Sequence, residues 1–563
     1  MRHSKSMIPL IASLMLTGPV AWTSARAQTA AESPAGSTTL SGLVSSTEEG
    51  PMGGVLVSAK RTGSPITITV VTDDKGRYSF PAGRLEPGAH AITIRAAGFV
   101  LNGAKSAELV ADKPGVADIT LAKTRKLSRQ ISNGEWLMSA PGQDKQKEFL
   151  TQCVGCHTLH RVFSSSYTAS EFQDIFQRMS RYSPGSTPTA PQPLLPGPRG
   201  ERPAVTGDAA KAAAAWLASV NLSDGDVRDY ALKTLPRPKG RSTRVVITEY
   251  DLPRKSTQPH DVIVDKQGRA WYSDFGNQFI GEMDIKTGKV IDHAVPVLKP
   301  EQPKGGLDVE FDPDGNVWLS MMYQAGIARI DTKTKAVTTY PFPSEWQSPS
   351  TQASMVSAAA MNVDGKVWTN NQEDHYSIRL DVKSGKYDFM QQNKDKSGKI
   401  VRAYGMPVDK TNSVYLLEFG GMTVGRRDAK TGDVQSWRTA TPGSRPRRGR
   451  VDDLNRLWFA EYGGNAIARF NFETGELAEW QLPRAWSAPY DVATTKNGDE
   501  AWTGSMLNDL VYRLNAKTGE ITEYLLPRTT NIRRVFVEEG SPRPVLWVGS
   551  NHGASIVKVE PLE

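Results

Sequence analysis

Apolar and polar residues alternate with a period of two through most of the second half of the chain, which indicates β-strands. From residue 242 onward, an aromatic residue that follows a turn recurs at intervals of 43 to 50 residues. Four strand-like segments with this spacing predict one blade of a β-propeller. The seven aromatic positions therefore predict seven blades over residues 242–563: Trp271, Trp318, Trp368, Tyr415, Trp458, Trp502 and Trp547.

The pattern also predicts how the ring closes. The segment 246–253 has the pattern of an outermost strand but precedes the first blade, whereas the last unit ends near Val559 without such a strand. We therefore expect this early segment to complete the last blade, which would leave no exposed sheet edges in the ring.

Residues 38–124 show shorter alternating runs separated by turns such as Asp73-Asp74-Lys75-Gly76. Strands at this spacing predict a small β-sandwich. The stretch from Ser41 to Phe99 resembles the carboxypeptidase regulatory-like (transthyretin-like) domain. The resemblance implies a stabilising or adhesive module, and we expect no chemistry in it.

Residues 130–235 change to helical patterns. A helix is expected from Gln143 to His160, a second opens at the capping box Thr168–Glu171 and runs to Tyr182, and a third covers 208–220. This order is that of a small α-helical cytochrome c domain. The predicted fold class is therefore mainly β, with an N-terminal β-sandwich, a small helical cytochrome domain and a C-terminal seven-bladed propeller.

The two cysteines of the chain provide the first candidate chemistry. Cys153, Cys156 and His157 form the pattern C-x-x-C-H, in which two thiols attach a haem and the histidine reaches its iron. This predicts covalent haem c, against the alternatives of a redox dithiol or half of a zinc site. Met179 is the candidate second iron ligand, with core packing of its side chain or an open iron position as alternatives.

The N-terminus indicates export. Arg2 and Lys5 precede the apolar run 7–16, and Ala25-Arg26-Ala27 is a cleavage motif, so residues 1–27 are predicted to be a signal peptide. We expect a periplasmic or secreted protein without a membrane span. The net charge of +8 is spread without a long Lys/Arg run, so nucleic acid is not an expected partner.

The propeller predicts a second candidate site on one face, near its axis. Residues three beyond each aromatic position and residues that start each innermost strand should meet there, and they could bind a polar ligand or a cation. The first set is Asp274, Met321, Asn371, Glu418, Glu461, Ser505 and Ser550. The second is His260, Leu307, Ser357, Tyr404, Arg447, Tyr490 and Arg533 or Arg534.

The propeller units resemble the virginiamycin B (streptogramin) lyase family, notably in PHDVIVDKQGRAWYSD and DDLNRLWFAEYGGNAIARF. The resemblance implies a seven-bladed propeller that opens a cyclic peptide lactone by elimination, with magnesium, a Glu-Pro-His motif and a second glutamate. The matching residues depart from this motif, as Gln258-Pro259-His260 with Asp274 and as Arg445-Pro446-Arg447 with Glu461. His260, Asp274, Arg447 and Glu461 are the candidate catalytic residues, and magnesium is a candidate ion at the rim.

The basic run Arg445, Arg447, Arg448 and Arg450 is either an anion-binding feature or a solvated loop. The leading functional hypothesis is an exported c-type haem protein for electron transfer, whose propeller binds a small polar substrate or a redox partner protein. On this hypothesis a haem-linked oxidoreductase is favoured over a magnesium-dependent lyase. The alternatives are a virginiamycin B lyase-like carbon–oxygen lyase with an accessory cytochrome, and a binding scaffold without turnover.

Overall fold

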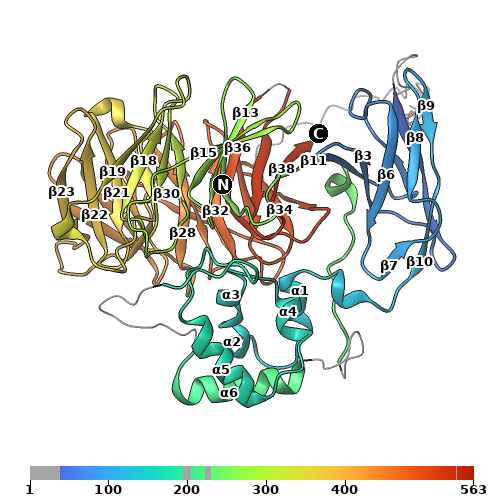
Figure 1. Ribbon diagram of the computed structural model, residues 1–563, viewed down its shortest axis with the longest axis horizontal. Coiled ribbons are helices and arrows are strands. Elements are labelled where there is room, and N and C mark those ends of the chain that lie inside the picture. Colours follow the sequence, from blue (N-terminus) through green and yellow to red (C-terminus); the bar gives the residue numbers. More distant parts are fainter. Residues whose placement is uncertain (1–37, 195–204, 222–229, 541) are drawn as a thin grey trace, which may run out of the picture.

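The computed structural model describes residues 38–194, 205–221, 230–540 and 542–563. The expected signal peptide, residues 1–27, lies outside these ranges. Figure 1 shows three parts: a β-sandwich at the N-terminal end, a large ring of β-sheets, and a group of short helices beneath one face of the ring.

The sandwich follows from alternating strands that bury one face. Its core contains Leu40, Val44, Val57, Ile92 and Leu121. One sheet has the order β2-β1-β10-β7, with β5 and β9 also paired to β1, and the other contains β4, β3, β6 and β8. The strands are β1 (Thr39–Ser46), β2 (Gly50–Pro51), β3 (Leu56–Arg61), β4 (Ile66–Val71), β5 (Arg77–Ser79), β6 (Gly88–Arg95), β7 (Phe99–Leu101), β8 (Ser106–Leu109), β9 (Pro114–Val116) and β10 (Ile119–Lys123).

The C-terminal part is propeller-like, with repeated antiparallel sheets of four strands, here called blades 1 to 7. Each of the seven expected aromatic side chains is buried in the second strand of its blade. The first strands of neighbouring blades contact one another, so they line the axis.

Blades 1 to 3 contain β12 (Pro259–Val264), β13 (Arg269–Asp274), β14 (Phe279–Asp284), β15 (Val290–Ala294); β16 (Val309–Phe311), β17 (Val317–Ser320), β18 (Gly326–Ile330), β19 (Val337–Pro341); and β20 (Val356–Ser357), β21 (Lys366–Asn371), β22 (Tyr376–Asp381), β23 (Lys386–Gln392). Blades 4 to 6 contain β24 (Ala403–Gly405), β25 (Val414–Glu418), β26 (Thr423–Arg427), β27 (Val434–Arg438); β28 (Pro446–Val451), β29 (Arg456–Glu461), β30 (Ala466–Asn471), β31 (Leu477–Gln481); and β32 (Pro489–Thr494), β33 (Glu500–Ser505), β34 (Leu510–Asn515), β35 (Ile521–Leu525).

Blade 7 joins the two ends of the ring. It contains β36 (Ile532–Glu538), β37 (Val545–Ser550), β38 (Ser555–Pro561) and the early strand β11 (Val245–Asp251). β11 pairs with β38 from Val245↔Pro561 to Asp251↔Ser555, which confirms the predicted closure. The other edge of β11 pairs with β4 of the sandwich, so blade 7 and one sandwich sheet form a continuous eight-stranded sheet.

The segment between sandwich and ring contains short helices: α1 (Asn133–Ser139), α2 (Asp144–Lys147), α3 (Leu150–Cys153), α4 (Leu159–Phe163), α5 (Ala169–Met179) and α6 (Gly207–Val220). Short 3₁₀ turns are η1 (Leu127–Arg129), η2 (Gly240–Thr243), η3 (Ser344–Trp346) and η4 (Met361–Val363). The predicted capping box Thr168–Glu171 opens α5. The continuous helix expected over 143–160 is wrong, because the chain there breaks into α2, α3 and α4.

The predicted fold class needs a correction. The protein is mainly β, with an N-terminal sandwich and propeller-like repeated sheets, but the helical segment is not shown to be a cytochrome c domain. In the described ranges, no helix has the length and apolar content needed to cross a membrane.

The helical segment packs on the ring and shares one apolar cluster with it. This cluster joins Trp136, Leu150 and Val154 of the segment to Phe275 and Tyr490 of the ring. Polar contacts add to it: Leu507 O accepts from Gly134 N at 2.7 Å, and Gly185 O accepts from Gln258 Nε2 at 2.6 Å. The helices therefore cover the ring face on which the candidate site was expected.

Candidate functional site

Two layers of polar side chains surround the axis of the ring. The inner strands β12, β28, β32 and β36 each change register near their start, which is the mark of a β-bulge. A bulge re-aims side chains, so consecutive residues both enter the axis. The axial ring, nearer the helices, is His260, Tyr404, Arg447, Tyr490 and Arg533, and the salt-bridge layer beside it is Asp261, Asp308, Arg448, Asp491 and Arg534.

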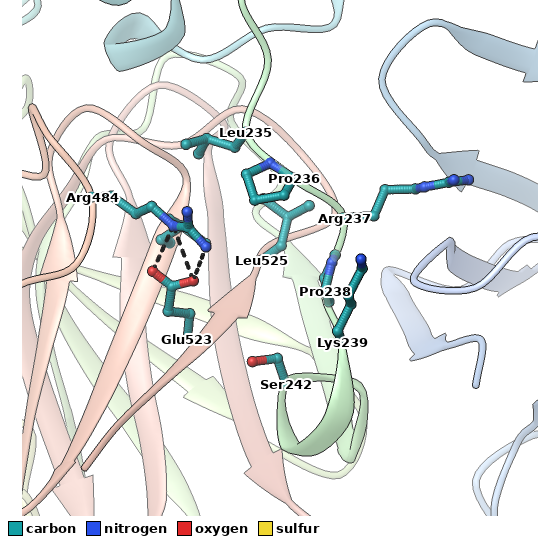
Figure 2. A pocket seen from close by; sticks show the side chains of 10 residues that line it. Leu235, Pro236, Arg237, Pro238, Lys239, Ser242, Arg484, Glu523 and Leu525 are labelled. Carbon is teal, nitrogen blue, oxygen red and sulfur yellow. Dashed lines mark hydrogen bonds and ion pairs between the residues drawn. The ribbon is translucent and has the colours of Figure 1, made fainter. Parts of the chain in front are cut away.

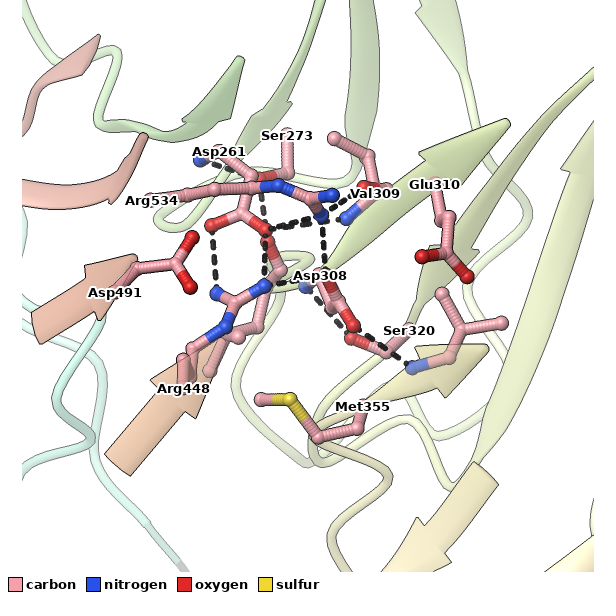
Figure 3. A network of polar contacts seen from close by, with 12 residues as sticks. Asp261, Ser273, Asp308, Val309, Glu310, Ser320, Met355, Arg448, Asp491 and Arg534 are labelled. Atoms are coloured by element: carbon pink, nitrogen blue, oxygen red, sulfur yellow. Dashed lines mark hydrogen bonds and ion pairs between the residues drawn. The ribbon is translucent and has the colours of Figure 1, made fainter. Parts of the chain in front are cut away.

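The salt-bridge layer pairs arginines with aspartates (Figure 3). Arg448 donates to both oxygens of Asp261 at 3.0 and 2.8 Å and to Asp308 at 2.5 Å. Arg534 donates to Asp308 at 2.7 Å. Burial raises the pKa of Asp308 to about 7, although the two arginines act to lower it. The layer therefore joins blades 1, 2, 5 and 7 through buried charges that have partners.

A chain of hydrogen bonds leads from this layer into the axial ring. His260 Nδ1 lies 2.6 Å from Asp261 Oδ1, and its Nε2 lies 3.2 Å from the hydroxyl of Tyr490. Because a carboxylate only accepts, Nδ1 carries the proton and Nε2 accepts from Tyr490. Complete burial lowers the pKa of His260 to about 3, despite the opposing effect of Asp261, so the ring is neutral at physiological pH.

Tyr490 is the acidic member of the chain. Burial alone would raise its pKa, but Arg447, Arg533 and Arg448 lower it below its ordinary value. The guanidinium of Arg447 lies 3.7 Å from the centre of the Tyr490 ring. The hydroxyl of Tyr404 is hydrogen-bonded to that of Tyr490, and burial raises its pKa. The pair therefore consists of a phenol whose pKa is lowered and a phenol whose pKa is raised, joined by one hydrogen bond.

The four predicted catalytic residues separate into two groups. The structure brings His260 and Arg447 together around Tyr490, with His260 at its hydroxyl and Arg447 over its ring. Asp274 accepts from Arg254 at 2.9 Å and from the backbone of Gly276 at 3.1 Å, so it organises a loop of blade 1.

Glu461 lies buried in blade 5 beside Glu479 of strand β31. Burial and the neighbouring carboxylate of Glu479 raise the pKa of Glu461 to about 8. Its carboxyl group is therefore mostly protonated at neutral pH. Like Asp274, it belongs to the interior of a blade, and the two carboxyls lie in different blades.

The predicted cofactors need a correction. Within the described ranges, no group of three or more His, Cys, Asp or Glu side chains could hold a metal ion. This finding overturns the expectation of covalent haem c on Cys153 and Cys156 with His157 and Met179 as iron ligands. Met179 ends α5 as a residue that is 40% exposed, and His157 Nδ1 lies 3.0 Å from the carbonyl of Thr158.

The same finding contradicts the expectation of a magnesium ion at the rim. Asp274 is engaged by Arg254 and by backbone amides, and Glu461 is a neutral acid in another blade. The electron-transfer hypothesis, which depended on the haem, has no support from the fold.

Val154 and Gly155 of the predicted haem segment nevertheless contact the ring beside the axial residues. Val154 O accepts from Asn531 Nδ2 at 3.2 Å and lies 2.9 Å from His552 Nε2, and Gly155 O accepts from Arg533 at 3.3 Å. Sequence reasoning missed Asn531, His552 and the aspartates of the salt-bridge layer. A strict period of two places Asp261 on the face of the strand opposite His260, so the aspartates were not expected at the axis. The one sign of a bulge in the sequence was the repeated Pro-x-x at the strand starts.

A separate pocket of about 240 Å³ lies between the linker that follows the helices and blade 6 (Figure 2). Leu235, Pro236 and Pro238 form one wall, and Leu510 and Leu525 belong to the blade. Arg484 and Glu523 pair with each other at its edge, at 2.7 Å. None of its lining residues belongs to the axial ring.

Comparisons with known proteins agree with two parts of this architecture. The model of the Virginiamycin B lyase family matches residues 299–504, and that of the Carboxypeptidase regulatory-like domain matches residues 39–122. These matches confirm the two resemblances that the sequence indicated. No curated protein matches the chain.

Solved structures with a similar fold include virginiamycin B lyase from Staphylococcus aureus, with 20% identity, coverage of 56% of this chain and 98% of that one, and a TM-score of 0.48. A catalytically inactive form of that lyase with Quinupristin gives 20% identity, 56% and 98% coverage, and a TM-score of 0.47. YCF48 bound to D1 peptide gives 12% identity, 55% and 94% coverage, and a TM-score of 0.42.

Proposed function

We propose that the protein is a carbon–oxygen lyase that cleaves its substrate by elimination, without water, at the axial ring. The observation that carries the proposal is the hydrogen-bond chain Asp261–His260–Tyr490, with an arginine against the tyrosine. An elimination needs a base of suitable pKa, a positive charge where negative charge develops, and an acid for the leaving oxygen. The match of residues 299–504 to the Virginiamycin B lyase family model supports a lyase reaction.

Tyr490 is the proposed base. Its lowered pKa increases the fraction of phenolate near neutral pH. His260 Nε2 accepts from the phenol form, and the Tyr404 hydroxyl can donate to the phenolate oxygen. Asp261 fixes His260 as the tautomer that accepts at Nε2, so His260 is a positioning residue for the Tyr490 hydroxyl. This is the logic of an activated nucleophile or base that is oriented by a third group.

The proposed reaction balances within these residues. The phenolate of Tyr490 takes the proton from the carbon next to a carbonyl group, and Arg447 stabilises the enolate oxygen that forms. The electron pair then makes a carbon–carbon double bond while the β carbon–oxygen bond breaks. Tyr404 donates its proton to the leaving oxygen, and proton transfer between the two hydroxyls restores the starting state.

The test is turnover of quinupristin and of a panel of β-acyloxy and β-alkoxy carbonyl compounds by the full-length protein. We expect a ring-opened or split product whose total mass equals that of the substrate, with the absorbance of a new conjugated double bond. Tyr490→Phe should lower kcat by about 10²-fold or more. Tyr415→Phe, a buried tyrosine of β25 outside the axial ring, should keep the activity. A product that has gained water, or an active Tyr490→Phe, would contradict the proposal.

A further inference from the structure

The two polar layers at the axis differ in charge balance. In the salt-bridge layer, Arg448 and Arg534 each pair with Asp261 and Asp308. In the axial ring, Arg447 and Arg533 are 8% and 4% exposed, and neither forms an ion pair with a carboxylate in the part of the chain that the structure describes. Arg448 and Arg534 are therefore neutralised by aspartates in the salt-bridge layer. The arginines that directly precede them, Arg447 and Arg533, have no such counter-charge in the axial ring.

The contacts of the two unbalanced arginines are with neutral groups and rings. Arg447 lies over the rings of Tyr490, Phe419 and Tyr462 at 3.7, 4.1 and 4.6 Å, and its Nε is buried without a hydrogen-bond partner among the described residues. Ring faces attract a guanidinium but leave its N–H donors unsatisfied.

Arg533 donates from Nε to Asn531 Oδ1 at 2.5 Å and from Nη2 to the carbonyl of Gly155 at 3.3 Å. Both acceptors are neutral amide oxygens. A carboxylate is a stronger partner for a guanidinium than an amide carbonyl. The Gly155 carbonyl therefore occupies a position in which an anionic oxygen would bind more tightly.

Burying a cation without a counter-charge is costly. Tyr490 can supply at most one negative charge against Arg447 and Arg533, so at least one positive charge stays uncompensated. We infer that the axial ring is a binding site for an organic carboxylate, held by Arg447 and Arg533 and flanked by aromatic rings. One clause of this inference, that the carboxylate belongs to the substrate of the elimination, rests on the proposed function.

The aromatic rings beside the two arginines favour an organic acid over an inorganic anion. Phe275 lies 4.6 Å from His260, ring centre to ring centre, and Phe419 lies 5.6 Å from Tyr404 and 5.3 Å from Tyr462. Such rings give an apolar or aromatic group a dry surface beside the two cations. Binding displaces the Gly155 carbonyl from Arg533, so the loop after α3 has to shift by the size of the incoming group.

The experiment is calorimetric titration of the full-length protein with phenylacetate, with its uncharged analogue phenylacetamide and with inorganic phosphate. We expect phenylacetate to bind at least about tenfold more tightly than either, because charge and ring are both recognised. Arg447→Gln and Arg533→Gln should each weaken it by about tenfold or more. Arg484→Gln, an arginine paired with Glu523 away from the axis, is the matched control and should leave the affinity within about twofold.

Arg533→Lys keeps the inference falsifiable if a glutamine variant fails to fold, since it retains the charge but not the planar donor pair. It should bind phenylacetate more weakly than the native protein does and still more tightly than it binds phenylacetamide. Equal affinities for phenylacetate and phenylacetamide, equal affinities for phenylacetate and phosphate, or no binding would overturn the inference. If Tyr490→Phe binds phenylacetate but the native protein turns over no substrate, the proposed function is wrong and the carboxylate site remains supported. If the native protein turns over substrates equally well with and without a carboxylate, the proposed function remains supported and the carboxylate is not part of the substrate.

Discussion

Tyr490 contacts three other members of the axial ring. Its hydroxyl contacts His260 and Tyr404, and its ring faces Arg447. Because arginines lower its pKa, the phenolate form gains population as pH rises, at lower pH than for an ordinary tyrosine. Elimination by the native protein should therefore rise with pH through this pKa and level off, which a pH profile of kcat measures. A flat or falling profile would argue against Tyr490 as the base.

Glu461 gives a residue-scale prediction about stability. The unfolded chain loses its proton near the ordinary value of 4.5, whereas the folded protein keeps it up to about pH 8. Within that window the unfolded state binds fewer protons, so the free energy of unfolding falls as pH rises. Glu461→Gln removes this fall, so its stability relative to the native protein should rise by about 1.4 kcal/mol at most for each pH unit within that window.

Thermal unfolding of both proteins at several pH values measures the difference. The exposed Glu473→Gln is the control and should show no pH-dependent gain. A constant difference in Tm between Glu461→Gln and the native protein across this range would rule out the titration of Glu461 as its source.

The residue scale also shows how far sequence alone leads. Aligning the repeats placed His260, Tyr404, Arg447 and Tyr490 on one ring, because equivalent strand positions share a level in a propeller. The alignment could not show that Asp274 lies outside this ring. Asp274 is held by Arg254, and Arg254 precedes the first blade and so has no equivalent position in the repeats.

At the scale of elements, the bulged inner strands and the closing strand decide the architecture. The closure by β11 followed from a missing strand pattern in the last repeat, and it is confirmed. The bulges were not predicted, because one extra residue changes the direction of two side chains without altering the hydrophobic pattern. The continuous helix expected around the cysteines was wrong because of tertiary contacts. The carbonyls of Val154 and Gly155 accept hydrogen bonds from Asn531 and Arg533 of the ring.

β11 offers a test of the closure, because it pairs on both edges. Thr248 lies opposite Lys558 of β38 and Ile68 of β4. Thr248→Pro removes a backbone donor and adds a steric conflict between two strands, and it should lower the free energy of unfolding by about 3 kcal/mol or more. The control, Thr338→Pro in β19, lies in a strand with a single paired neighbour and should cost less. Denaturant unfolding that shows equal losses would contradict a closing role for β11.

At the scale of the whole molecule, the sandwich extends blade 7 and covers its outer edge. Val246 of β11 is fully buried and belongs to the core of the sandwich. A chain that starts at residue 125 exposes this edge and this side chain together, and unpaired edges invite association between copies. We expect the shortened chain to self-associate, which light scattering measures.

Adding Val246→Lys to the shortened chain should return it to a monomer, because a lysine on an exposed edge opposes pairing. If the shortened chain without this substitution is already monomeric and as stable as the full chain, the sandwich does not protect the ring. This dependence between distant parts could not be read from the sequence, since nothing in the pattern of β4 names β11 as its partner.

The lowered pKa of Tyr490 in the axial ring can be tested without a substrate. The near-ultraviolet difference spectrum of the full-length protein is recorded as pH is raised, beside that of Tyr490→Phe. We expect one phenolate to form below the ordinary tyrosine pKa of about 10 in the native protein and to be absent from the variant. If both proteins form their first phenolate together near that ordinary value, Tyr490 is not activated and the proposed elimination loses its base.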